Sequence, residues 1–293
     1  MNKPESGKLD VPGATLHYEV RGSGPLLLLI PGGAGDAGMY AGMAGVLADA
    51  GYTVASFDPR ALSRSRLHVP LGDQRVAEWS EDARLLIDHL SPGEPASVLG
   101  CSAGAIVALD LLARHPDRVH RLIAHEPPLL ELLDDPVPHK ALFADVREVF
   151  RAEGVGAAMA RFSEGMTGDH PTDHSADRPA ERPADRPTDR EPMELPPEIQ
   201  EMASRMHANQ PVFLEHMLVP FSSTVPDVEA LRNAATKLVP AAARESRDLL
   251  PLYGPVARLA SLVGRPLEEF PGGHLGAVER PREFAERMLT LLG

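Results

Sequence analysis

Residues 100–104 read Gly-Cys-Ser-Ala-Gly, and this stretch restricts the possible folds more than any other in the chain. It fits the pattern G-x-S-x-G, in which a serine occupies a tight turn between a strand and a helix. Such a turn tolerates only small residues two positions either side of the serine, because larger side chains would meet the strand and the helix. The apolar run 96–99 predicts a short buried strand before the turn. The stretch 103–114 favours a helix that ends before Pro116.

Strand-like and helix-like segments alternate along both ends of the chain. The runs that predict strands are 16–20, 26–30, 53–57, 96–99, 119–125, 238–243 and 267–270. The stretches that favour helices are 39–50, 79–90, 103–114, 252–262 and 281–292. Alternation of this kind predicts an α/β fold with a mostly parallel, twisted sheet and helices on both faces.

The alternation stops between residues 129 and 235. The stretches 138–163 and 195–217 favour helices, and no good strand lies between them. We therefore expect a core made of residues 1–128 and 236–293, interrupted by an inserted helical lid over 129–235.

Inside the expected lid, residues 169–192 form a degenerate four-residue repeat whose clearest copy is Asp-Arg-Pro-Ala. The tract contains no aromatic or large aliphatic residue, so it cannot bury enough surface to offset its chain entropy, and we expect it to be disordered. His170 and His174 imitate a metal-binding pair, but the neighbouring prolines exclude the helix that such a pair needs. The purpose of the tract is left open.

Composition narrows the class of protein. With 293 residues, of which 43% are hydrophobic, the chain can build one large core with an insertion. Its net charge of −13 argues against nucleic acid and membranes as partners, because both attract basic surfaces. The polar residues 1–12 lack the apolar centre of a signal peptide, and the apolar run 26–31 is too short to span a bilayer. The single cysteine, Cys101, can form no intramolecular disulfide. We expect a cytoplasmic protein, and its oligomeric state is left open.

A serine nucleophile needs a base within reach, and that base needs an acid to orient it. His274 is the candidate base, because it lies in a Gly-rich loop directly after the last predicted strand. The turn at residues 100–104 is called the elbow, and the helix 103–114 that follows it the elbow helix. Glu126 is the favoured acid, because it follows the next strand after the elbow helix and two prolines restrict its loop. Glu245 and Asp248, which follow the next strand along the chain, remain open as alternatives.

Acyl transfer also needs hydrogen-bond donors aimed at the developing oxyanion. One is expected to be the backbone N–H of Ala103, and the other that of Gly33 or Ala34 in the glycine-rich loop after strand 26–30. Cys101 is expected to be a packed, inert thiol, because the elbow exposes its central residue and buries the neighbours. No spacing typical of a metal site or a phosphate-binding loop occurs, and no cofactor is indicated.

The glycine-rich loop after strand 26–30 is called the oxyanion loop. Apolar residues of the expected lid and of the segment after this loop are candidates for the wall of the substrate pocket. They either line an apolar pocket or simply pack the lid on the core. These candidate substrate-binding residues are Met39, Tyr40, Phe213, Met217 and Phe221.

With Ser102, Glu126 and His274 in this order, the chain resembles the α/β-hydrolase superfamily, and more narrowly the fungal zearalenone lactonase type, over nearly everything outside the repeat tract. The stretches that carry the resemblance are Phe57-Asp58 with Ser63-Arg64-Ser65, and residues 100–102, 115–118, 125–126, 211–213, 227–231, 271–272 and 274. The resemblance implies an α/β-hydrolase fold, with the acid at Glu126. It departs from that type at Phe213, where the family has a tryptophan, and at Gly32, where the family has an aspartate.

These observations together predict a cofactor-free serine hydrolase that cleaves a carboxylic ester or a lactone through an acyl-enzyme. The resemblance implies a bulky, apolar small molecule as the substrate class. Four other reactions of the same triad stay open, namely thioester hydrolysis, acyl transfer to an alcohol, carbon–carbon bond hydrolysis and perhydrolysis. A ligand-binding receptor with a vestigial triad is a further alternative from a different class.

Overall fold

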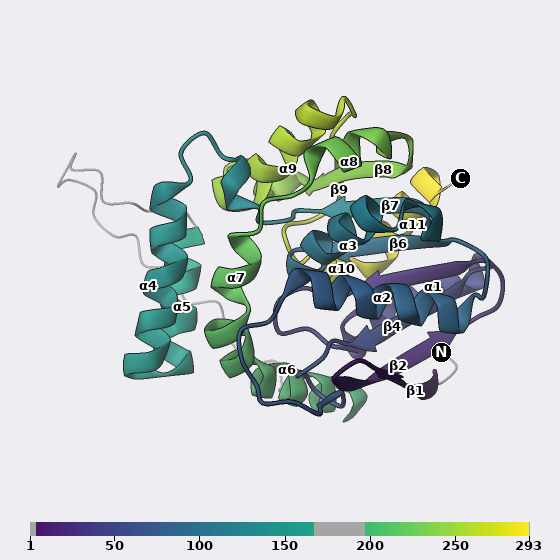
Figure 1. The fold of residues 1–293 in the computed structure, drawn as a ribbon, viewed down its shortest axis with the longest axis horizontal. Coiled ribbons are helices and arrows are strands. Elements are labelled where there is room, and N and C mark those ends of the chain that lie inside the picture. The colour runs from purple at the N-terminus through teal and green to yellow at the C-terminus, as the bar shows by residue number, and fades with distance from the viewer. Residues whose placement is uncertain (1–3, 167–196, 293) are drawn as a thin grey trace, which may run out of the picture.

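The computed structural model describes residues 4–166 and 197–292. The repeat tract 169–192 therefore lies outside the described residues. Within the described part, a nine-stranded sheet runs through the molecule, and helices cover both of its faces (Figure 1). The α/β class predicted from the sequence is confirmed.

The strand order is β1-β2-β4-β3-β6-β7-β8-β9, with β5 paired beside it on β2. The strands are β1 (Glu5–Val11), β2 (Ala14–Arg21), β3 (Leu26–Ile30), β4 (Thr53–Asp58), β5 (Arg66–Leu67), β6 (Ala96–Cys101), β7 (Val119–His125), β8 (Leu238–Ala243) and β9 (Glu268–Phe270). Strands β4 to β9 along this order pair in parallel, whereas β2 is antiparallel to β1, β4 and β5. The carboxyl ends of the parallel strands consequently meet along one edge of the sheet.

Alternate residues of the central strands face two apolar cores on opposite sides of the sheet. In β3, Leu26, Leu28 and Ile30 belong to one core, and Leu27 and Leu29 belong to the other. All five side chains are buried. A parallel strand covered on both faces has this continuous apolar sequence, because water reaches neither face.

Helices cover both of these cores. The first core packs against α2 (Val76–Leu90), α3 (Ala103–Arg114), α8 (Val228–Asn233) and α9 (Leu250–Val263). The second packs against α1 (Ala41–Asp49) and α11 (Pro281–Leu292), with the short α10 (Gly276–Glu279) beside them.

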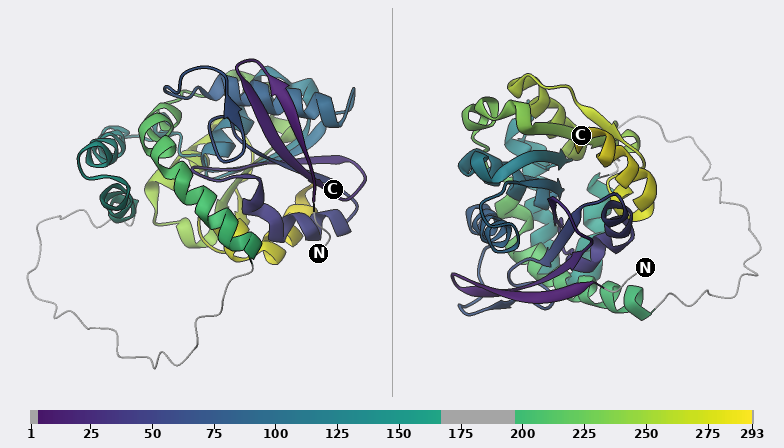
Figure 2. Two further views of the ribbon diagram at one scale, coloured as in Figure 1. Left: turned by 90° about the horizontal axis from the view of Figure 1, so that it is seen from below. Right: turned by 90° about the vertical axis from the view of Figure 1, so that its right-hand side faces the viewer.

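Four more helices form a segment that we call the helical insertion: α4 (Val137–Glu153), α5 (Val155–Met166), α6 (Pro197–His216) and α7 (Leu218–Ser222). They share a third apolar cluster, to which Phe143, Ala158, Leu214 and Leu218 contribute. Figure 1 shows α4, α5 and α7 on one side of the sheet. In the left view of Figure 2, α4 and α5 are seen nearly end-on, while α6 lies against the body of the molecule.

Several elements differ from those expected. The single helix predicted over 138–163 is two helices, because Gly154 ends α4 with a φ of 88° and a ψ of −174°, an extended conformation that only glycine adopts readily. The segment 39–50 begins as a 3₁₀ turn at Ala37–Tyr40 before α1. The edge strand β1 and the short helices α7, α8 and α10 were not predicted, because β1 is mostly polar and the helices are too short to show a period.

Candidate active site

The turn between β6 and α3 has the geometry that its glycines indicate. Ser102 adopts a φ of 54° and a ψ of −125°, a conformation that costs a non-glycine residue strain. A Cβ at Gly100 would lie 2.4 Å from the carbonyl oxygen of Gly104, and one at Gly104 would lie 2.3 Å from that of Ile30. Both positions therefore require glycine, and the strained serine is held between them.

Glu126 has a second strained backbone on the neighbouring strand, with a φ of 49° directly after β7. Its N–H donates to the carbonyl of Ala241 in β8 at 2.9 Å. On the other side of β7, the N–H of Ser102 donates to the carbonyl of His125, also at 2.9 Å. Ser102 and Glu126 consequently leave the sheet from adjacent parallel strands, at the same edge.

The carboxylate of Glu126 is fully buried and both of its oxygens are hydrogen-bonded. One oxygen, Oε2, lies 2.7 Å from Nδ1 of His274, and Oε1 accepts the N–H of Ala243 at 2.9 Å. Burial raises the pKa of Glu126, but the hydrogen bond to His274, the nearby imidazoles and the Ala243 N–H outweigh burial, so the pKa lies below its ordinary value. The site thus stabilises an ionised carboxylate against the histidine ring.

The two other carboxylates considered for this role lie apart from that hydrogen bond. Glu245 accepts from Nη2 of Arg280 at 3.0 Å, and 58% of its side-chain surface is exposed. Asp248 is also exposed. Of the three acids considered, Glu126 is the one that the structure brings to His274, whose side chain keeps 26% of its surface exposed.

The loop after β3 passes directly against the serine. A Cβ on Gly32 would lie 2.5 Å from the carbonyl oxygen of Cys101 and 2.8 Å from Cβ of Ser102. Gly33 follows with a φ of 51°, and Ala34 completes the turn. Ala103 is the first residue of α3, so its N–H has no acceptor within that helix.

Four polar residues near this loop were not predicted as site residues. Asp36 is fully buried and accepts from Nε of Arg205 at 2.5 Å and from Oγ of Ser63 at 3.1 Å. Asn209 is 4% exposed, and its Nδ2 donates to the carbonyl of Ala34 at 2.9 Å. Arg205 and Asn209 are four residues apart in a segment that had been predicted as helical, which is the signal that could have revealed them.

Three of the five candidate wall residues are buried instead. The exposed fractions are 1% for Tyr40, 0% for Met217 and 2% for Phe221, so these side chains pack rather than offer a surface to a ligand. Phe221 makes an edge-to-face contact with Trp79, with ring centroids 5.1 Å apart. Tyr40 packs in the second core together with Cys101.

Met39 and Phe213 remain partly exposed beside the loop. The Sδ of Met39 would lie 2.6 Å from a Cβ on Gly35, and the Phe213 ring 3.7 Å from one on Gly33. Cys101 is buried, and burial raises the pKa of its thiol to about 12, as expected for an inert cysteine.

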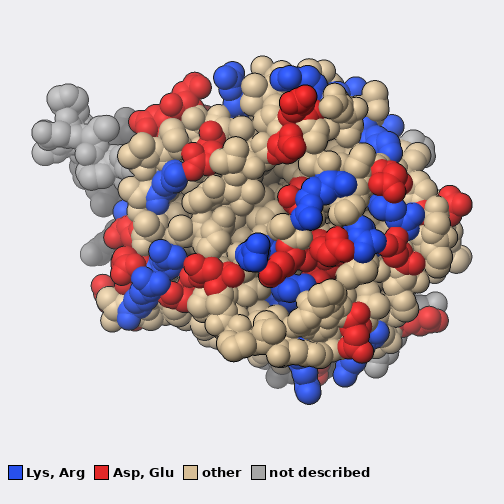
Figure 3. Space-filling model, in the orientation of Figure 1, with Lys and Arg blue, Asp and Glu red and all other residues tan. Residues whose placement is uncertain are grey.

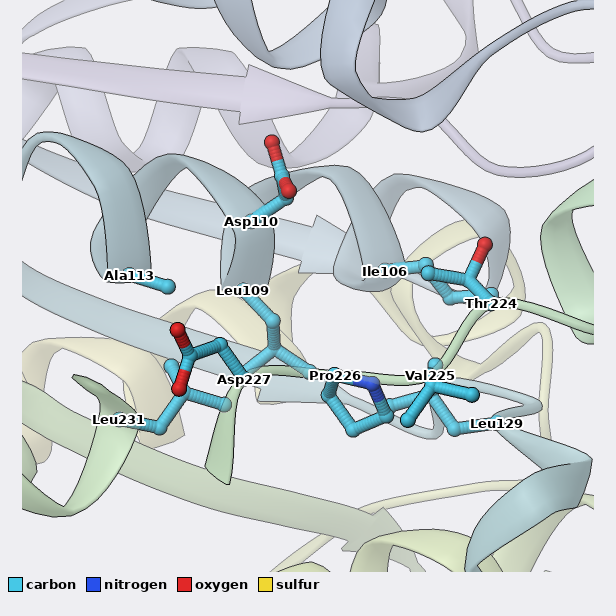
Figure 4. Close-up of a pocket in the computed structure, with 10 residues that line it drawn as sticks. All are labelled: Ile106, Leu109, Asp110, Ala113, Leu129, Thr224, Val225, Pro226, Asp227 and Leu231. Carbon is cyan, nitrogen blue, oxygen red and sulfur yellow. The ribbon is translucent and has the colours of Figure 1, made fainter. Parts of the chain in front are cut away.

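A small pocket lies elsewhere, between α3 and the chain that enters α8. Figure 4 shows Ile106 and Leu109 of α3 facing Val225, Pro226 and Asp227 across it. Its volume is about 30 Å³, which is close to the space of one water molecule. This pocket is too small for an organic substrate.

In the described ranges 4–166 and 197–292, no group of three or more His, Cys, Asp or Glu side chains is placed to hold a metal ion. No helix in those ranges has the length and apolar character that crossing a membrane requires. On the face drawn in Figure 3, acidic and basic side chains are interspersed rather than gathered by sign.

Comparisons with known proteins agree with this architecture. Residues 25–209 match the family model of the alpha/beta hydrolase fold. The chain is 35% identical over 291 residues to the uncharacterized hydrolase YraK of Bacillus subtilis (strain 168), covering 98% of this chain and 96% of that protein. It is 33% identical over 127 residues to the zearalenone hydrolase of Bionectria ochroleuca, covering 42% of this chain and 46% of that protein.

Among solved structures, a thermophilic esterase from Thermogutta terrifontis superposes with a TM-score of 0.71 at 19% identity. The match covers 98% of both chains. At this identity the similarity shows a shared fold and nothing about activity.

Proposed function

The chain belongs to the α/β-hydrolase family, and on that basis we propose that it is a serine hydrolase that cleaves a carboxylic ester or a lactone. The observation that carries the proposal is the 2.7 Å hydrogen bond between Glu126 and His274, at the sheet edge where the strained Ser102 also lies. A buried acid that orients a histidine prepares that histidine to act as the base for a serine hydroxyl.

In the proposed reaction, His274 acts as the base. Its Nδ1 is engaged by Glu126, so Nε2 is the nitrogen available to take the proton of Ser102 as Oγ attacks the carbonyl carbon. The imidazolium then gives this proton to the leaving alcohol oxygen, and the acyl group remains on Ser102. A water molecule, deprotonated by His274, attacks the acyl-enzyme, and the serine recovers its proton as the acid is released.

The negative charge that develops on the carbonyl oxygen needs donors. The N–H of Ala103 and that of Gly33 or Ala34 are proposed for this role, because the loop and the first turn of α3 both adjoin Ser102. Throughout the cycle Glu126 stays ionised and stabilises the imidazolium, which agrees with its lowered pKa.

The proposed substrate class is an apolar small molecule. Met39 and Phe213 place a thioether and an aromatic ring next to the oxyanion loop. The partial similarity to a zearalenone hydrolase supports a small-molecule substrate, since that name describes an enzyme that hydrolyses zearalenone.

A fluorophosphonate probe and a panel of p-nitrophenyl esters and lactones of graded size test the proposal. We expect the probe to label the wild type stoichiometrically, and Ser102→Ala to abolish both labelling and turnover. Cys101→Ala is the matched control, because it alters the adjacent but buried residue. Full turnover by Ser102→Ala, or a wild type that the probe never labels, would overturn the proposal; the latter result would favour a ligand-binding protein.

A further inference from the structure

One face of α6 follows the oxyanion loop along its length. The residues on this face are Met202, Arg205, Asn209 and Phe213, which are spaced three and then four apart, the period of one helix face. Phe213 lies over Gly33, Asn209 bonds to Ala34, Arg205 bonds to Asp36, and Met202 lies over Gly38. Helix α6, which the left view of Figure 2 shows against the body of the molecule, is thus a partner of the loop as well as a part of the insertion.

Asn209 is the best-bonded residue of this face. Its Nδ2 donates to the carbonyl of Ala34 at 2.9 Å and to Oγ of Ser63 at 2.8 Å, and its Oδ1 accepts the N–H of Ser63 at 2.8 Å. The partners fix the orientation of the amide, because a backbone N–H needs an acceptor and a carbonyl needs a donor. With 4% of its surface exposed, Asn209 is shielded from water that would compete for these bonds.

The bond to Ala34 constrains a particular peptide plane. The carbonyl of Ala34 and the N–H of Gly35 belong to one rigid peptide unit. Asn209 holds the carbonyl, and the carbonyl oxygen of Gly32 accepts the Gly35 N–H at 2.9 Å. The plane is therefore held from both sides, which limits how far the preceding plane, with the N–H of Ala34, can rotate.

A second contact anchors the same helix at the other end of the loop, and Ser63 Oγ links it to Asn209. The buried carboxylate of Asp36 accepts from Arg205 of α6 and, through its other oxygen, from the N–H of Gly38 at 2.9 Å. A buried carboxylate needs a cation close by, so this ion pair ties α6 to the far end of the loop.

We propose that Asn209 is a positioning residue that holds the loop so that its N–H groups point at the oxyanion. This inference rests on the proposed function, because it concerns the donors of that reaction. The helical insertion then takes part in the chemical step through the contact of α6 with the loop.

The test compares Asn209→Asp with the wild type. Aspartate has the same size, but it places a carboxylate oxygen against the Ala34 carbonyl, so two acceptors face each other. We expect kcat on a p-nitrophenyl ester to fall by about ten- to a hundredfold, with KM changed by less than about threefold, because a misplaced oxyanion donor weakens the transition state alone. The affinity for a trifluoromethyl ketone, which forms a tetrahedral adduct with the serine, is expected to fall by the same factor as kcat/KM.

Two further variants separate positioning from folding. Ser63→Ala keeps the bond from Asn209 to Ala34 and is expected to lose much less activity than Asn209→Asp. His207→Ala changes the exposed side of α6 and is the control for the helix itself. The end point of fluorophosphonate labelling counts folded sites, so kcat is expressed per labelled site.

An Asn209→Asp enzyme with wild-type kcat per labelled site and wild-type ketone affinity would overturn the inference, even if its Tm fell. An equal loss in Ser63→Ala would also overturn it, because the effect would then run through Ser63 rather than Ala34. If Asn209→Asp gives no folded sites, Asn209→Ala, which removes the bond without repulsion, is measured against the same criteria. A wild type that neither hydrolyses esters nor reacts with the probe is a failure of the proposed function itself.

Discussion

The substitution Glu126→Gln tests the proposed acid with almost no change of shape. The glutamine amide has one oxygen, which accepts hydrogen bonds, and one NH₂ group, which donates them. The N–H of Ala243 requires the oxygen at the position of Oε1. The amide NH₂ then faces Nδ1 of His274, which must accept rather than donate. The ring proton consequently moves to Nε2, the nitrogen that is needed to take the proton of Ser102.

The size of the effect follows from these two hydrogen bonds. With the wrong tautomer, a serine triad loses about 10⁴ in kcat, or roughly 5 kcal/mol at 1.36 kcal/mol per factor of ten. Rotating the amide restores the tautomer but sets its NH₂ against the buried N–H of Ala243, which costs about 1–3 kcal/mol. That rotation still leaves the imidazolium without an anion, so we expect kcat to fall by about 10²- to 10⁴-fold.

The assay is steady-state hydrolysis of a p-nitrophenyl ester, with active sites counted by the end point of fluorophosphonate labelling. Glu245→Gln is the matched control. It neutralises a glutamate that lies near the loop of His274 but pairs with Arg280 rather than with the histidine. Its kcat is expected to stay within about threefold of the wild type. If Glu126→Gln retained more than a third of the wild-type rate while Glu245→Gln or Asp248→Asn abolished it, the assignment of the acid would be refuted.

Three further outcomes follow from the same structure. Gly32→Ala is expected to lower kcat at least tenfold, because the new methyl group would lie 2.5 Å from the Cys101 carbonyl oxygen and 2.8 Å from Cβ of Ser102. Gly33→Ala meets no atom closer than 3.7 Å, so its cost is the strain of an alanine at a φ of 51°; its loss of kcat should be the smaller one, and equal losses would contradict this. Burial raises the pKa of the Cys101 thiol to about 12, so a thiol reagent should react with it only after denaturation, as followed by mass spectrometry. Burial lowers the pKa of His125 from 6.5 to about 4, so stability is complete above pH 6.5 and declines as the pH falls toward 4. Between pH 7 and pH 4, the free energy of unfolding measured with urea should fall by about 3 kcal/mol less in His125→Leu than in the wild type. An equal fall in both proteins would contradict burial of His125 as the cause.

Much of the fold could be predicted because its signals are local. The buried strand Leu26–Ile30, the elbow helix 103–114 and the closing helix 281–292 have the predicted bounds, since an apolar run or a regular period marks each of them. The break at Gly154 was not predicted, because one glycine within a periodic stretch is compatible with a continuous helix. The polar strand β1 was not predicted, because it forms by pairing with β2 and its own sequence has no strand pattern.

The site divides in the same way. The glycines around Ser102 predict a turn with no room for side chains. The structure has this crowding, because a Cβ at Gly100 would lie only 2.4 Å from the carbonyl oxygen of Gly104. The contact between Glu126 and His274 agrees with their positions after predicted strands, although their catalytic roles remain proposals. The roles of Arg205 and Asn209 depend on how α6 lies across the loop, and a helical period shows which residues share a face but not what that face meets.

The polar contacts of this site also bear on the order in which the protein folds. The bond from Asn209 to Ala34 joins residues 175 positions apart, and that between Glu126 and His274 joins residues 148 apart. Contacts so distant in sequence close large loops, whose entropy must be lost before the contacts contribute any stabilisation. After dilution from denaturant, helical circular dichroism should therefore recover before hydrolase activity, so that activity reports the last long-range closures rather than the appearance of secondary structure.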